Sequence, residues 1–127
     1  MARVLGVGGV FFACKDTDAT KDWYVRVLGM TAEAFGGFVF QHARSAGVAG
    51  ERAYTVFSPF AADSDYFAPS DLPFMFNLMV DDLDGMLARA RGEGVSPLQP
   101  VESNEFGRFA WILDPDGRKI ELWQPPV

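Results

Sequence analysis

Few side chains in this 127-residue chain could carry chemistry, and the most suggestive of them is Glu121. Alternate side chains of a strand face opposite sides, so Lys119 and Trp123 share the face of Glu121 in the last predicted strand. A carboxylate beside a tryptophan can orient a polar or cationic ligand group, or act as a general base toward a proton next to a carbonyl. Glu121 is therefore the candidate catalytic residue; the alternative is a surface carboxylate or a simple hydrogen-bonding residue.

Other catalytic chemistries find little support in the sequence. The chain contains one cysteine, Cys14, and one histidine, His42, which lie on separate predicted strands. A single thiol excludes an intrachain disulfide and a thiolate zinc cluster, and the separation argues against a Cys–His catalytic pair. The glycines at 6, 8 and 9 precede a strand and lack the spacing of a dinucleotide-binding loop.

Composition and charge restrict the class of protein further. Hydrophobic residues make up 49% and aromatic residues 14% of the chain, which is typical of an ordered globular domain. The net charge of −6 argues against nucleic acid as a partner. No apolar stretch approaches the length of roughly 20 residues that a membrane helix needs. The apolar N-terminus is interpreted as a first strand rather than a signal peptide, and the expected location is cytoplasmic.

Two stretches of the chain repeat one pattern, an apolar run followed by an acidic turn, a helical segment and glycine. Asp16 and Asp82 occupy equivalent positions, and each can cap the helix that follows. The first helix is predicted to end at Gly29. The second carries an apolar stripe of Leu83, Met86, Leu87 and Ala90.

Short strands are predicted around these helices. They cover residues 9–14, 30–35, 38–43 and 52–58 in the first half, and residues 74–80, 97–101, 106–114 and 119–124 in the second. The result is an α+β fold with two βαβββ modules, about 5–58 and 74–125, within a single domain spanning 1–127. Such modules would form a curved mixed sheet around a cup, with the helices outside. The linker 59–73 contains Tyr66 and Phe67, which favours packing as a lid.

The first and fifth predicted strands are apolar on both faces, and each therefore needs two partners. A helix can cover one face, and a small ligand in the cup could occupy the other. The alternatives are core packing between the halves and a subunit interface. The candidate ligand-binding residues are Phe11, Phe57, Met75, Asn77, Met79, Trp111 and Trp123.

Several of these motifs together resemble the vicinal oxygen chelate superfamily, which comprises glyoxalases, bleomycin-resistance proteins and extradiol dioxygenases. The similarity is carried by Asp22-Trp-Tyr-Val-Arg-Val-Leu-Gly-Met30, by Val80-Asp-Asp-Leu-Asp84, and by the closing segment 109–123 with its Asp-Pro-Asp-Gly and Glu-Leu elements. The resemblance implies the paired-module fold. It does not select a reaction, because the superfamily includes lyases, isomerases, dioxygenases and proteins that sequester drugs.

The resemblance also implies where a divalent metal would lie in catalytic members. The last-strand ligand falls on Glu121, whereas the others fall on Gly9, Met75 and, loosely, Thr55. One carboxylate with a glycine, a thioether and a hydroxyl does not build a divalent metal site. We therefore expect no metal and no other cofactor.

Three functions remain open from the sequence. The first is a metal-free protein that sequesters or recognises a small aromatic or cationic ligand. The second is a lyase or isomerase of the glyoxalase type with Glu121 as general base. The third is a non-catalytic structural dimer whose cup is filled by side chains. Exposed sheet edges, and the resemblance, favour a homodimer.

Overall fold

The computed structural model describes residues 1–127. Its helices are α1 (Thr17–Leu28), α2 (His42–Ala49) and α3 (Leu83–Gly92), and the short 3-10 helix η1 (Gly50–Arg52) follows α2. Its strands are β1 (Phe76–Met79), β2 (Glu102–Asn104), β3 (Gly107–Leu113) and β4 (Lys119–Gln124). None of the helices combines the length and the apolar character needed to cross a membrane.

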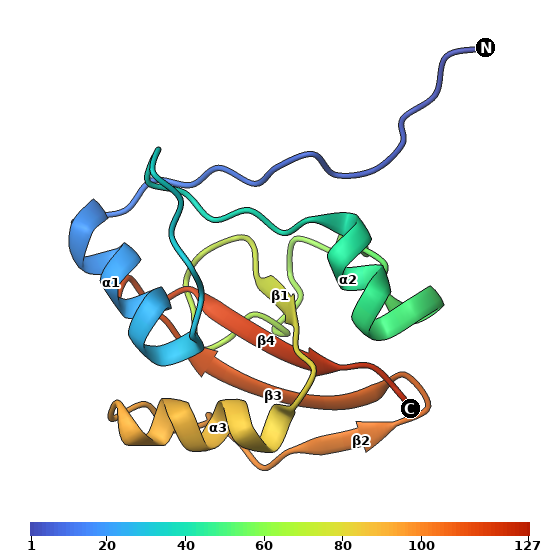
Figure 1. Ribbon diagram of the computed structural model, residues 1–127. Coiled ribbons are helices and arrows are strands. Elements are labelled where there is room, and N and C mark those ends of the chain that lie inside the picture. Colours follow the sequence, from blue (N-terminus) through green and yellow to red (C-terminus); the bar gives the residue numbers. More distant parts are fainter.

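The four strands form one mixed sheet in the order β1-β4-β3-β2. Strand β4 lies between β1, which runs parallel to it, and β3, which runs antiparallel. Helices α1 and α3 contact each other and lie beside the sheet, whereas α2 lies apart from them near β1 (Figure 1). The predicted α+β class is confirmed.

Both helices of the repeated pattern start at the predicted aspartates. The side chain of Asp16 accepts a hydrogen bond from the Ala19 amide at 3.0 Å, and Asp82 accepts one from the Gly85 amide at 3.0 Å. Helix α1 ends at Gly29, whose φ of 67° is the left-handed conformation that glycine adopts without steric cost. The local capping signals in the sequence therefore predicted these boundaries correctly.

The hydrophobic core lies between α1, α3 and one face of the sheet. On β4, Ile120 and Leu122 are fully buried in this core, which confirms the predicted alternation of the last strand. On β1, Phe76 and Leu78 pack against the same core. The opposite face of the sheet carries Glu121, and we call it the Glu121 face.

Most of the strands predicted in the first half do not form. Residues 9–14, 30–35, 38–43 and 52–58 make no strand, and a single bridge between Ala32 and Phe38 is all that pairs there. Strand pairing needs a neighbouring edge, and no first-half segment pairs with the outer edge of β1. The βαβββ pattern is therefore complete only in the second half.

Two differences from the predicted elements have local reasons. The end of the strand predicted at 38–43 and the connection that follows it form α2, because the alanine-rich segment 42–49 contains one β-branched residue and alanine is the strongest helix former. The strand predicted at 97–101 lies instead at Glu102–Asn104, beyond Pro97 and Pro100, which cannot donate backbone hydrogen bonds to a ladder.

A buried ion pair attaches the N-terminal segment to the end of the sheet. In the turn between β3 and β4, Arg118 Nη1 lies 2.8 Å from Asp114 Oδ2. The same carboxylate accepts the Tyr24 hydroxyl at 2.7 Å, and Arg118 also donates to the backbone oxygen of Ala13. The Arg118 guanidinium lies 4.6 Å from the centre of the Phe12 ring. This turn therefore connects three segments that are distant in sequence.

Candidate functional site

Glu121 is a buried carboxylate at the centre of a hydrogen-bond network whose outer members are partly open to solvent. Its side chain accepts a hydrogen bond from Asn77 Nδ2 at 2.7 Å and one from Trp111 Nε1 at 2.8 Å. A third comes from the hydroxyl of Tyr66. Asn77 and Trp111 lie directly opposite Glu121 in the neighbouring strands β1 and β3, so the register of the sheet brings them together. Glu121 itself is only 7% exposed.

The linker 59–73 covers part of this network. Tyr66 reaches Glu121 from the linker, and its ring stacks on Phe60 with ring centres 5.6 Å apart. Phe67 also packs against Phe60, at 5.0 Å between ring centres. The linker consists of short turns, including hydrogen bonds from the Ser64 amide to the Ala61 oxygen and from the Ala68 amide to the Asp65 oxygen. It packs on the sheet as the embedded aromatic residues predicted.

Lys119 places a positive charge beside Glu121. Its Nζ atom donates to the backbone oxygen of Tyr66 at 2.6 Å and lies 5.1 Å from the centre of the Tyr66 ring. The Trp111 ring centre is 5.9 Å from the same atom. Burial lowers the pKa of Lys119 below its ordinary value, although the negative charge of Glu121 opposes this. The network therefore joins an acceptor, a cation and aromatic rings in one place.

Sequence reasoning did not assign Tyr66 or Lys119 to the site. Lys119 could have been found, because it is two residues from Glu121 on the same face of a predicted strand. Tyr66 could not be assigned, since it is separated from Glu121 by 55 residues and lies in a linker whose path carries no periodic signal. For Glu121 and Asn77, the sequence predicted only that both residues belong to one cup, and not that they are hydrogen-bonded to each other.

The remaining predicted residues lie outside this hydrogen-bond network, although Trp123 and Met79 are on the same face of the sheet. Trp123 is buried, packs against the tilted ring of Tyr54 at 5.1 Å between ring centres, and donates from Nε1 to the Phe106 oxygen at 2.7 Å. Met75, which precedes β1, and Met79, which ends it, are both partly buried. Phe11 and Phe57 are 96% and 89% exposed and lie outside the network. The structure thus brings together Glu121, Asn77 and Trp111 from the predicted set.

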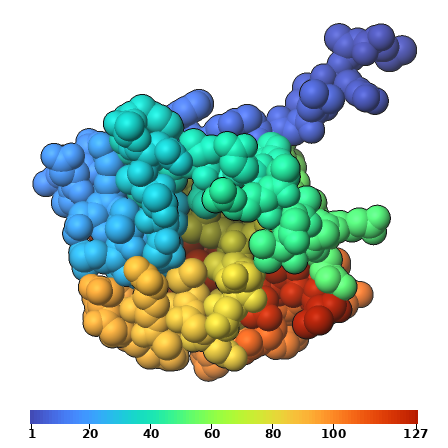
Figure 2. Space-filling view, viewed as in Figure 1, coloured from blue at the N-terminus to red at the C-terminus, as the bar shows by residue number.

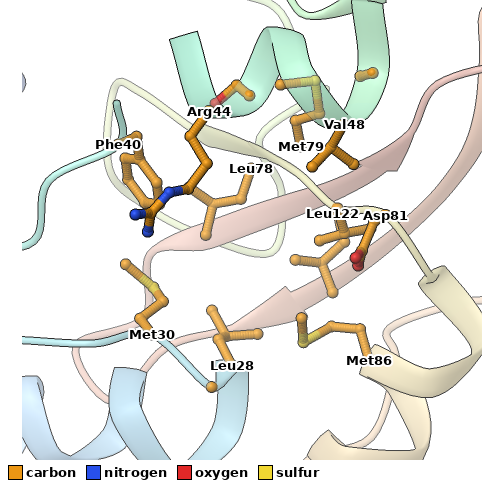
Figure 3. A pocket seen from close by; sticks show the side chains of 14 residues that line it. Leu28, Met30, Phe40, Arg44, Val48, Leu78, Met79, Asp81, Met86 and Leu122 are labelled. Atoms are coloured by element: carbon orange, nitrogen blue, oxygen red, sulfur yellow. The ribbon is translucent and has the colours of Figure 1, made fainter. Parts of the chain in front are cut away.

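An apolar pocket of about 330 Å³ lies elsewhere, between α2, the end of β1 and the residues after α1. Figure 2 shows the hollow it forms on this face of the molecule, and Figure 3 shows Arg44 extending from α2 toward Phe40 and Met30. Met79 is the one predicted ligand-binding residue that lines it. Glu121 does not line it, so this pocket is a separate feature from the Glu121 network.

Tyr24 is expected to resist ionisation while the protein is folded, and Tyr66 while the linker is closed on Glu121. Burial, followed by hydrogen bonding to Asp114 and Glu121 respectively, raises the pKa of each hydroxyl well above the ordinary value of 10.0. The folded state then keeps protons that the unfolded chain loses, so this stabilisation is complete below pH ~10 and is lost at higher pH.

The measurement is a tyrosinate absorbance titration at alkaline pH with circular dichroism alongside. Tyr24→Phe should lose part of the absorbance change that accompanies unfolding of the wild type. If Tyr24→Phe instead lacks an absorbance change that the wild type shows while its secondary structure is still native, the prediction is wrong.

Comparisons with known proteins agree with this architecture. The family model described as the Glyoxalase/Bleomycin resistance protein/Dioxygenase superfamily matches residues 6–122. The chain belongs to this superfamily. A search of curated protein sequences finds no match.

Several solved structures share the fold at low sequence identity. TnmS3, an antibiotic binding protein from Streptomyces sp. CB03234, is 24% identical with a TM-score of 0.53, and the match covers 88% of each chain. A glyoxalase/bleomycin resistance protein from the same organism is 24% identical with a TM-score of 0.52, covering 87% of this chain and 92% of its own. A protein of unknown function from Agrobacterium tumefaciens str. C58 is 20% identical with a TM-score of 0.56, covering 97% and 100%.

The residues around Glu121 do not fit the divalent metal that the superfamily implies. No three His, Cys, Asp or Glu side chains of the chain lie close enough to hold a metal ion together. Both oxygens of Glu121 already accept hydrogen bonds, and its neighbours are an amide, an indole, a phenol and an ammonium group. An ammonium cation and N–H donors repel a metal ion rather than ligate it.

Proposed function

We propose that this protein binds a small aromatic or cationic molecule on the Glu121 face and that it does so without a divalent metal. The observation that carries the proposal is the buried carboxylate of Glu121, whose hydrogen-bond donors come from β1, β3 and the linker. Buried charges of this kind are costly for stability, and a fully apolar contact could replace them. A binding site gives such a polar centre a function, because it fixes the orientation of a ligand.

The surrounding side chains supply the contacts that an aromatic ligand needs. Phe109 and Trp111 are stacked on the same face, with ring centres 6.4 Å apart and an interplanar angle of 16°. Stacking on such rings contributes dispersion energy beyond the area that it buries. The antibiotic binding protein TnmS3 shares this fold, which supports a binding role for the present chain. A cytoplasmic location is part of the proposal, and the free thiol of Cys14 is compatible with it.

The test is a thermal-shift screen of small aromatic and cationic compounds against the wild type, Glu121→Gln and Arg44→Ala. Ligands of the Glu121 face should stabilise the wild type and Arg44→Ala but not Glu121→Gln. Arg44 lines the separate apolar pocket, so it is the matched control. Compounds that stabilise Glu121→Gln as well as the wild type, and fail with Arg44→Ala, would contradict the proposal and favour the apolar pocket.

Proton-transfer chemistry of the lyase or isomerase type is the second candidate. Tyr66 and Lys119 favour it, because they place two further titratable groups against the carboxylate of Glu121. Both oxygens of Glu121 are occupied by donors, however, and a substrate would have to displace one of them. We therefore expect no turnover of the hemithioacetal of methylglyoxal and glutathione; turnover lost in Glu121→Gln would select the enzyme instead.

We also propose that the protein forms a homodimer, in which the first half of the chain contacts a second copy. Phe11, Phe35 and Phe57 are largely exposed, and the outer edge of β1 has no neighbouring strand. Exposed apolar groups and a free sheet edge favour association. Light scattering should give twice the mass of one chain, and Phe57→Asp should shift the protein toward the monomer. A monomer at every concentration tested would contradict this.

A further inference from the structure

Of the three donors to Glu121, only Tyr66 comes from a segment outside the sheet. Asn77 and Trp111 belong to β1 and β3, whose backbones are hydrogen-bonded to β4 on either side. Tyr66 belongs to the linker, and its side chain is 40% exposed. The backbone–backbone hydrogen bonds of the linker around it are short-range turns, so local opening breaks the contacts of Tyr66 with Glu121 and Lys119 but no strand pairing. Tyr66 is therefore the exchangeable partner of Glu121.

The space that Tyr66 occupies has a defined chemistry on the sheet side. It offers the carboxylate of Glu121 as a hydrogen-bond acceptor, the Lys119 ammonium 5.1 Å from the ring centre, and the neighbouring Trp111 indole. The stacking partner Phe60 belongs to the linker and would move with Tyr66. What the sheet holds in this position is thus an aromatic ring with a hydroxyl donor.

The charges on either side of this space restrict what can replace Tyr66. The Lys119 ammonium faces the ring, so a cationic ligand group would be repelled. An anionic ligand group would be repelled by Glu121 in the same way. A neutral hydroxyl on an aromatic ring satisfies both, because it donates to the carboxylate and presents its electron-rich face to the ammonium.

We propose that Tyr66 fills the ligand subsite in the free protein and that the ligand is a phenol, whose hydroxyl replaces that of Tyr66 on Glu121. This rests on the proposed function and narrows its ligand class to neutral hydroxylated aromatic compounds. Occupation by Tyr66 lowers the apparent affinity of the wild type, because only the fraction of molecules with an open linker can bind.

The experiment compares 4-fluorophenol with fluorobenzene by ligand-observed fluorine NMR. Tyr66→Ala removes the ring and hydroxyl that 4-fluorophenol reproduces. This variant should bind 4-fluorophenol about tenfold or more tightly than the wild type does, because the competitor is gone. It should also prefer 4-fluorophenol over fluorobenzene by about tenfold or more, because a hydroxyl that donates to a carboxylate makes a charge-assisted hydrogen bond.

Two controls connect the effect to this subsite. Tyr54→Ala removes a side chain of the same type that packs against Trp123 and is not hydrogen-bonded to Glu121, and it should create no preference for the phenol. Adding Glu121→Gln to Tyr66→Ala should abolish the preference. Equal binding of the two probes by Tyr66→Ala, or the same preference in Tyr54→Ala, would overturn the proposal.

A milder variant covers the case in which Tyr66→Ala does not fold. Tyr66→Phe keeps the ring and removes only the hydroxyl, so the linker should open more often and 4-fluorophenol should bind severalfold more tightly than to the wild type. Unchanged or weaker binding would overturn the inference.

If the wild-type screen finds no ligand and Tyr66→Ala still selects the phenol, the proposed function fails and the assignment of Tyr66 stands. If wild-type ligands depend on Glu121 and Tyr66→Ala shows no phenol preference, only this inference fails.

Discussion

Asp114→Ala is expected to lower the free energy of unfolding by about 3–5 kcal/mol, because it removes one partner of a buried ion pair. The side chains of Asp114 and Arg118 are 0% and 3% exposed. Asp114 accepts hydrogen bonds from the Tyr24 hydroxyl, from the Arg118 guanidinium and from two backbone amides of its own turn. Its loss leaves the buried cation with Asp116, at 3.2 Å, as its one remaining carboxylate partner. Urea unfolding followed by tryptophan fluorescence measures the change.

An exposed ion pair of the same chain provides the control. Arg108 and Asp84 lie 2.9 Å apart, but their side chains are 35% and 74% exposed. Asp84→Ala should therefore change stability by about 1 kcal/mol or less. Similar losses of unfolding free energy in Asp84→Ala and Asp114→Ala would show that burial does not make the Asp114–Arg118 pair more important for stability than an exposed pair.

Glu121→Gln is expected to weaken ligand binding by about 10- to 100-fold, since it replaces a charge-assisted hydrogen bond with a neutral one. The substitution keeps the size of the side chain. It replaces one of the two acceptor oxygens with an NH2 group, which faces donors that in the wild type have an acceptor at both positions. Calorimetric titration of compounds found in the thermal-shift screen measures the affinity of each protein.

Stability has to be separated from binding in this comparison. Gln99→Ala, whose amide contacts only Glu102 on the surface, is a control that should leave affinity unchanged. Glu121→Gln must also retain the far-UV circular dichroism of the wild type. Affinities for wild type and Glu121→Gln that agree within twofold would show that the carboxylate does not contact the ligand.

The parts of the fold that the sequence predicted are those with local causes. Helices α1 and α3 follow from the caps at Asp16 and Asp82 and from apolar residues spaced along one helical face. Strand β4 follows from strict alternation, which assigned Ile120 to the core and Glu121 to the other face. Each of these signals lies within a few residues of the feature that it determines.

The first half was predicted less well because its strands depend on non-local pairing. Residues 52–58 alternate in a way that is typical of a strand, yet nothing in the chain pairs with them. Residues 42–49 show how local propensity then prevails, since an alanine-rich segment without a neighbouring edge forms α2.

The site shows the same division between local and distant causes. Asn77, Trp111 and Glu121 could be predicted to share a face, because the alternation of each strand is visible in its own residues. Tyr66 could not, because its position depends on how fifteen or so residues of turns fold back over the sheet, and such turns leave no periodic pattern. The apolar pocket was missed for a related reason, since α2, which forms one wall, was not predicted as a helix.

The most direct test of a metal-free Glu121 face is the metal content of the purified, untagged protein. Wild type and Glu121→Gln should be exposed to nickel, zinc, manganese and ferrous iron, then desalted and measured by elemental analysis. Because Glu121 is hydrogen-bonded to Asn77, Trp111 and Tyr66, we predict no stoichiometric metal in either protein. About one metal ion per chain in the wild type, lost in Glu121→Gln, would contradict the account and make Glu121 a metal ligand.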